Sequence, residues 1–137
     1  MHRFILALSC ILMMLAAPIS AQDFQKGYEA YQNGDCANAL KEWTPLAAGG
    51  NSVAQNNLGV LYRHVWGVRQ DYKEAVRLYT LATEQGYASA QFNLGVMYEE
   101  GEGVPKDDKE AVRSLPRCRA ETGQLVFVRQ VREGGKC

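Results

Sequence analysis

The sequence is poor in the residues and motifs from which catalytic and metal-binding sites are built. It contains only two histidines among 137 residues, and no cysteines or histidines are paired at the spacing of a zinc site. A serine-nucleophile motif, a phosphate-binding glycine loop and a dinucleotide fingerprint are also missing. We therefore expect no metal, no cofactor and no enzymatic activity.

Long hydrophobic runs are scarce too, since only residues 4–17 form one. This run of 14 residues follows a short basic start and precedes the small residues of "PISAQ". It is shorter than the roughly 20 residues that cross a membrane, and it has the layout of a secretory signal peptide. We predict a signal peptide at 1–21, a mature chain that starts at Gln22 without a membrane span, and export to the periplasm or the extracellular space. A membrane anchor is the disfavoured alternative.

Neither sign of charge is in excess, because 15 basic residues face 15 acidic ones. The balance varies along the chain, and residues 112–137 carry 6 basic and 2 acidic groups. A basic arm can bind nucleic acid or a membrane surface. Aromatic residues do not interleave with these arginines, and an exported protein rarely meets nucleic acid. We expect no nucleic-acid partner.

Cysteine is too scarce for a disulfide framework. Cys10 falls in the hydrophobic run, which leaves Cys36, Cys118 and Cys137 in the mature chain. Three is an odd number, so no complete set of disulfides is implied even in an oxidising compartment. The disulfide state of the three residues stays open at this point.

What the sequence does have is an internal repeat with a period of 36 residues. Residues 51–77 and 87–113 are identical at 15 of 27 aligned positions, and a weaker copy precedes them at 24–50. Identity at this level indicates a duplicated supersecondary unit. The structural positions of the repeat are Ala54, Leu58, Gly59, Tyr62, Gly67, Asp71, Ala75, Gly86, Ala90, Leu94, Gly95, Tyr98, Gly103, Asp107 and Ala111.

Each copy has the pattern of two helices. In the first helix Ala54, Leu58, Leu61 and Tyr62 fall on one face. The recurring glycine at Gly59 suggests that a second helix passes too close for a side chain. Helices are predicted at about 23–33, 36–48, 51–64, 71–85 and 87–100, with a sixth that starts near 107.

The second helix of each copy has its own start and stop signals. Asp71 and Asp107 are predicted N-caps, and a glutamate follows each of them after three residues, at Glu74 and Glu110. That spacing resembles a capping box. Gly86 is the predicted C-cap of the helix that starts at Asp71.

The segments "AQNNLGVLY", "AQFNLGVMYEEGEGV" and "DYKEAVRLYTLATEQG" resemble Sel1-like repeats, relatives of the tetratricopeptide repeat with a longer loop. The resemblance is strong over 51–113 and weaker over 23–50, and Trp66 departs from its loop pattern. It implies an all-α fold, a right-handed solenoid of antiparallel helix pairs, and a scaffold role in an exported bacterial protein. The units are a signal peptide at 1–21, a tetratricopeptide-like pair at 22–50, a repeat at 51–86, an incomplete repeat at 87–113 and a divergent, irregular tail at 114–137.

A solenoid presents a concave surface that suits a protein or peptide partner. The candidates for binding are residues that differ between copies on the exposed face of the first helix of each pair. By analogy with tetratricopeptide geometry they are Gln25, Glu29, Gln32, Asn56, Arg63, His64, Phe92, Glu99 and Glu100. Phe92 stands out because it replaces Asn56, and an exposed aromatic ring can anchor a peptide.

Two features resemble catalytic groups. His64 is the only histidine of the mature chain, and "EEGE" at 99–102 gathers three carboxylates. We interpret His64 as a surface residue and the carboxylates as a helix end in water. Some exported relatives are linked to peptidoglycan or β-lactam binding, so a cell-wall-binding protein with weak hydrolase activity stays open as an alternative. This chain lacks the paired cysteines that those relatives typically carry.

The repeat breaks off inside its last helix. Identity ends at Arg113, and Pro116 falls in the helix interior, where proline costs about 3 kcal/mol. We hypothesise that the tail is out of frame and that a longer array once continued here. The alternative is a real cap, in which "QLVFVRQV" at 124–131 covers the open end of the solenoid.

An array that stops at Arg113 would leave its last complete helix uncovered. Phe92, Leu94 and Met97 would then be exposed, which favours self-association through the open end. A truncated remnant without independent function is the remaining alternative.

Overall fold

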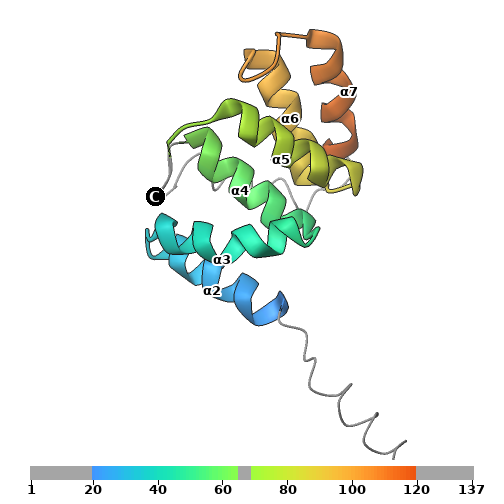
Figure 1. The fold of residues 1–137 in the computed structure, drawn as a ribbon. Helices are drawn as coiled ribbons and strands as arrows, with labels where there is room; N and C mark the ends of the chain where they lie inside the picture. The colour runs from blue at the N-terminus through green and yellow to red at the C-terminus, as the bar shows by residue number, and fades with distance from the viewer. Residues whose placement is uncertain (1–19, 65–68, 120–137) are drawn as a thin grey trace, which may run out of the picture.

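The computed structural model describes residues 20–64 and 69–119, and within these ranges the chain forms helices and no strand. The helices are α2 (Ser20–Gln32), α3 (Cys36–Ala48), α4 (Ser52–His64), α5 (Tyr72–Glu84), α6 (Ala88–Glu100) and α7 (Asp108–Arg119). Each packs against the next in the sequence, so α2 and α3 lie at one end of the array and α6 and α7 at the other (Figure 1). The predicted all-α solenoid is confirmed.

The predicted helix bounds agree closely with the observed ones, except at the two ends of the array. Helix α2 begins at Ser20, before the predicted start of the mature chain at Gln22. The rest of the predicted signal peptide, residues 1–19, lies outside the described residues, as do Gly67 of the repeat pattern and the segment 124–131.

Aspartate caps start the second helix of each pair, as predicted. The Asp71 carboxylate accepts a hydrogen bond from the Glu74 amide at 3.0 Å. The Asp107 carboxylate accepts from the amides of Lys109 and Glu110 at 2.9 and 3.2 Å. These bonds satisfy amides that have no partner inside the helix.

The predicted capping box is wrong in its second half. Glu74 and Glu110 do not reach back to the caps but pair with Arg77 and Arg113, at 2.6 and 3.1 Å. The reason lies in the preceding helix, because the Asp71 amide already donates to the Tyr62 carbonyl at 3.0 Å. The Asp107 amide donates to the carbonyl of Tyr98 in the same way.

Gly86 ends α5 as predicted, but it is not the C-cap itself, because the C-cap is Gln85 and Gly86 follows it. The φ of Gly86, +81°, lies in the left-handed region that glycine adopts without strain. The next amide, of Tyr87, then donates to the Ala82 carbonyl at 3.1 Å, which closes the helix end. The chain reverses here, and α6 begins directly afterwards.

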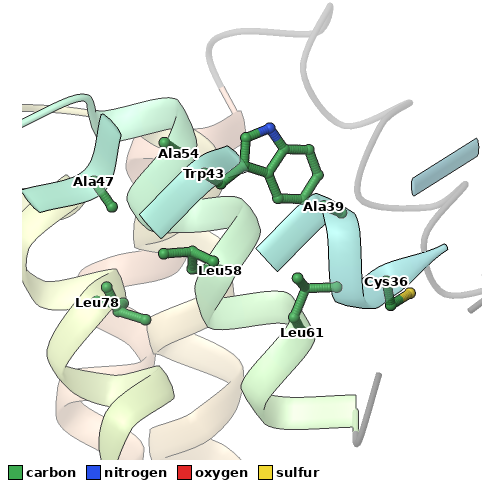
Figure 2. Packing of buried hydrophobic residues seen from close by; sticks show 8 residues of the cluster. All are labelled: Cys36, Ala39, Trp43, Ala47, Ala54, Leu58, Leu61 and Leu78. Atoms are coloured by element: carbon green, nitrogen blue, oxygen red, sulfur yellow. The ribbon is translucent and has the colours of Figure 1, made fainter. Parts of the chain in front are cut away.

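The core consists of two clusters on either side of α4. The first joins α3, α4 and Leu78 of α5 around Trp43, which is 1% exposed (Figure 2). The second joins α4, α5 and α6 around Tyr79 and Met97, both fully buried. Tyr62 is half-buried and packs against both clusters, so α4 connects the two halves of the array.

In the first two pairs a glycine lets the two helices come close together. A Cβ atom on Gly59 would lie 2.6 Å from the ring of Tyr79, which confirms that a second helix passes too close for a side chain. The first pair repeats the arrangement, since a Cβ on Gly27 would clash with the ring of Trp43.

Two predictions about the end of the array are wrong: that the regular structure ends at Arg113, and that apolar residues of the preceding helix are uncovered. Helix α7 continues through Pro116 to Arg119, although sequence identity ends at Arg113. Leu94 and Met97 are 7% and 0% exposed, because they pack with residues of α4 and α5, and the prediction that they are uncovered is wrong. Proline is tolerated inside α3 as well, at Pro45, because packing of the apolar face outweighs the loss of one backbone hydrogen bond.

Candidate functional site

The nine predicted binding residues do not form one open surface. Gln25, Glu29 and Gln32 are exposed along α2, and the Gln25 amide donates to the Glu29 carboxylate at 3.2 Å. Glu99 is exposed near the end of α6, whereas Phe92 is half-buried on the same helix. The remaining four residues make contacts within and between the repeats.

Asn56 was predicted to be exposed, and this prediction is wrong. It is 1% exposed, and its side chain accepts a hydrogen bond from the Asn93 side chain at 3.0 Å and donates one to Asn57 at 3.3 Å. Buried amide groups are stable when they are paired in this way. Asn56 therefore joins α4 to α6 and is not available to a partner.

Arg63 and Glu100 bind each other instead of a ligand. The Arg63 Nη2 lies 2.6 Å from the Glu100 carboxylate, and its Nε lies 2.7 Å from that of Glu102. Burial is the largest single cause and acts to lower the pKa of Arg63, but the hydrogen bond to Glu102 and the nearby charges of Glu102 and Glu100 together outweigh it, so the pKa is raised. The acidic stretch at 99–102 thus does not simply end a helix in water, because two of its carboxylates connect α6 to the end of α4.

His64 is half-buried at the end of α4 and differs from the surface residue we expected. Burial is the main cause that lowers its pKa, and the neighbouring charge of Arg63 lowers it further. Neutral imidazole is therefore favoured near neutral pH. In the described part of the chain, no three His, Cys, Asp or Glu residues are grouped so that they could hold a metal ion.

A hollow among the described residues lies elsewhere, between α3, α4 and α5, and we call it the α3–α5 groove. Its volume is about 580 Å³. It is lined by Thr44, Ala47, Ala48, Gly50, Gln55, Leu58, Tyr62, Glu74, Arg77, Leu78, Leu81, Glu84 and Gln85. None of the nine predicted binding residues is in this lining.

The groove combines an apolar floor with a polar rim. Leu58 and Leu78 in its lining are buried, whereas Arg77 and Glu84 are exposed. This arrangement suits a segment that inserts apolar side chains and keeps polar groups at the edge.

Buried hydrogen bonds fix the shape of the groove. The Gln55 side chain is 4% exposed and donates to the Ala47 carbonyl at 3.1 Å. The Gln85 side chain donates to Gln55 at 2.9 Å, so one glutamine connects the ends of α3 and α5. Gln55 is identical to Gln91 in the next copy, and this repeated polar residue on an apolar face was the sequence signal for a buried role.

Sequence reasoning missed the groove because it assigned function to the first helices of the pairs. The groove belongs mainly to the second helices, α3 and α5, and to the gap between two consecutive pairs. A single helix pattern does not reveal the width of such a gap.

The helices match those of Sel1-repeat proteins. The family model of the Sel1 repeat matches residues 52–87 and 88–113. A Sel1 repeat protein from Oxalobacter formigenes is similar in structure, with a TM-score of 0.70 and 33% identity over 80% of this chain and 44% of that chain. A protective antigen present in uropathogenic Escherichia coli strains, which displays an SLR fold, has a TM-score of 0.67 and 34% identity over 79% of this chain and 25% of that one.

No curated protein matches the chain. The chain spans less than half the length of either of these solved structures. Among the described residues, no helix is both long and apolar enough for a membrane span. The chain therefore contains two Sel1 repeats and has the solenoid fold of Sel1-repeat proteins.

Proposed function

We propose that the chain is an exported, non-enzymatic scaffold that binds a protein or peptide partner in the α3–α5 groove. Sel1 repeats generally mediate protein interactions, which supports a binding role. The observation that carries the proposal is the groove itself, because it has an apolar floor and an exposed polar rim. The first helices are less suited to a partner, since Asn56, Arg63 and Glu100 are engaged with neighbouring repeats.

The groove favours a partner segment with a row of apolar side chains flanked by basic groups. Leu58, Leu78 and Leu81 offer apolar contacts, and the rim contains two carboxylates, Glu74 and Glu84, with one guanidinium, Arg77. Arg77 is already paired with Glu74 at 2.6 Å. The Glu84 carboxylate is the charged group best placed to attract a basic residue.

Export is supported by the apolar run at 4–17 with its basic start. A disulfide at Cys36 agrees with an oxidising compartment. The two similar solved structures come from bacteria, and we propose a bacterial source and the periplasm or the outside of the cell for this chain. N-terminal sequencing of the exported protein should begin at Gln22; an unprocessed Met1 in the membrane fraction would contradict export.

The binding role is tested by capturing partners from an envelope extract with the mature chain and two variants. Leu81→Glu puts a charge into the groove, and Val112→Glu puts the same charge on α7, where Val112 is 63% exposed and outside the groove. We expect the same protein to bind the wild type and Val112→Glu but not Leu81→Glu. Equal capture by all three proteins would contradict a site in the groove.

A further inference from the structure

Cys36 is the first residue of α3, is 5% exposed, and is disulfide-bonded. The other cysteines of the chain are Cys10, Cys118 and Cys137. One of them must therefore be the partner within the same chain.

The distance limit of a disulfide and the removal of the predicted signal peptide leave one of these three cysteines as the partner of Cys36. A disulfide needs Cα atoms within about 7 Å. Cys118 belongs to α7, which lies at the opposite end of the array from α3 (Figure 1). Packed helices are about 8–10 Å apart, so α4, α5 and α6 keep the two helices far beyond that limit. Cys10 belongs to the predicted signal peptide, so it is absent from the mature chain that we propose. Cys137 remains.

The chain is long enough to reach back. Residues 120–137 number 18 and span up to about 60 Å when extended, whereas four helix spacings are about 40 Å or less. Consecutive helices are antiparallel, so α3, α5 and α7 run in the same direction. The end of α7 therefore lies on the side where α3 and α5 end, which is where Gly50 and Gln85 line the groove. A chain that runs from Arg119 to Cys36 meets the groove on its way along α3.

The segment 124–132, "QLVFVRQVR", has the chemistry that the groove favours. It contains five apolar residues, two arginines and no acidic residue. Leu125 and Phe127 match an apolar floor, and an arginine at 129 or 132 matches the Glu84 carboxylate at the rim.

We propose that residues 124–132 occupy the α3–α5 groove of their own chain and are retained there by a disulfide between Cys36 and Cys137. The segment is then an internal ligand that competes with an external partner. This inference rests on the proposed function, because it takes the groove as the partner's site. It also takes 114–137 as a working part of the protein and not as an out-of-frame tail.

The covalent step balances as a thiol–disulfide exchange. The two cysteine thiols lose two protons and two electrons to a low-molecular-weight disulfide, which is reduced to two thiols. A dithiol reductant reverses the step. Reduction releases the tether, and the segment then competes for the groove without a covalent bond.

The disulfide is tested by peptide mapping of the exported, full mature chain without reduction. We expect a linked pair of peptides that contains Cys36 and Cys137 and that separates on reduction. A bond from Cys36 to Cys10 or Cys118, or a bond between two chains, would overturn the proposal.

The position of the segment is tested by photocrosslinking in the oxidised chain, with p-benzoylphenylalanine in place of Phe127. We expect crosslinks to peptides from 44–62 and 74–85, several-fold weaker crosslinking in the Leu81→Glu background, and no change in the Val112→Glu background. Crosslinks to 88–119 instead would place the segment over the open end of the array and overturn the proposal.

Competition is tested with the Cys137→Ser variant in the envelope capture experiment. We expect this variant to retain the partner about tenfold more strongly than the oxidised wild type, because the tether raises the effective concentration of the segment. Equal retention would overturn the competition while the groove remained the partner's site. Loss of capture in every variant would instead contradict the proposed function.

Discussion

At the scale of single residues, the contact between Gly59 and Tyr79 sets the spacing of α4 and α5. We expect Gly59→Ala to destabilise the fold, because the new methyl group would lie 2.6 Å from the Tyr79 ring. Overpacking costs about 1–3 kcal/mol, which exceeds the gain of up to about 1 kcal/mol that alanine brings to a helix. Urea denaturation of the mature chain measures the difference.

Two variants make this result specific. Gly49→Ala is the matched control, since its Cβ would have contacts of 3.4 Å and its φ of −76° is open to any residue. Combining Gly59→Ala with Tyr79→Leu should cost less than the sum of the two single changes, because the smaller side chain makes room. Additive costs would mean that the two residues do not meet.

The hydroxyl of Tyr79 predicts a loss of stability in alkali. It is fully buried, it makes no hydrogen bond to any described residue, and burial raises its pKa well above the ordinary value of 10.0. Above pH 10 the unfolded chain releases this proton and the folded chain keeps it, so stability falls by up to about 1.4 kcal/mol per pH unit. Below pH 10 the Tyr79 hydroxyl is neutral in both the folded and the unfolded chain, so it does not make stability depend on pH.

Tyr79→Phe should remove the part of the fall in stability above pH 10 that is due to the Tyr79 hydroxyl. At pH 7 we expect the variant to be as stable as the wild type or slightly more stable, because it removes a buried polar group without a partner. Melting temperatures of both proteins between pH 7 and 11 give the comparison. Parallel curves would show that the Tyr79 proton is not coupled to folding.

At the scale of elements, the ion pairs of Arg63 connect α4 to the end of α6. Glu102 is the stronger partner, because its side chain is 23% exposed whereas that of Glu100 is 42% exposed. We expect Glu102→Gln to cost about 1–2 kcal/mol and Glu100→Gln less than about 1 kcal/mol. Thermal melts of the two variants and the wild type measure both costs, and melts at low and high salt show how much of each cost is electrostatic.

Glu99→Gln supplies the control for charge alone, because Glu99 is exposed on the same helix end. Its effect should be close to zero. A loss as large as that of Glu102→Gln would mean that net charge, and not the bond to Arg63, is the cause.

Helix bounds, caps and turns were predictable from the sequence where they depend only on residues of one helix and its ends. The bounds of α3, the caps at Asp71 and Asp107, and the turn at Gly86 depend on neighbours a few residues away. The close contact at Gly27 was missed because Gly27 follows Lys26, so the first unit lacks the Leu-Gly pair that marks Gly59 in the next unit.

The candidate site could not be predicted in the same way, because it depends on how pairs stack. Whether Asn56 faces solvent or α6 is decided by the crossing of two helices, and the sequence of either one fits both cases. The continuation of α7 past Pro116 is likewise decided by its packing on α6, which outweighs the cost of one proline.

At the scale of the whole molecule, stability in a repeat array is the sum of the pairs and the interfaces between them. The cluster around Trp43 and the cluster around Met97 share α4, since Leu58 faces the first and Val60 the second. Tyr62 packs against both. We therefore expect the described helices to unfold as one cooperative unit and not pair by pair.

This coupling predicts that a cavity in the cluster around Met97 also lowers the stability of the cluster around Trp43. Met97 is 0% exposed, so Met97→Ala should cost about 2–5 kcal/mol. Trp43 belongs to the other cluster and is 1% exposed, and its fluorescence in a Trp66→Phe background reports the unfolding of α3. We expect Met97→Ala to move the urea midpoint of Trp43 fluorescence by the same amount as that of helical circular dichroism, whereas Val112→Ala moves neither. If the Trp43 midpoint stayed in place while helix was lost earlier, the first pair would fold independently, and α4 would not couple the two clusters.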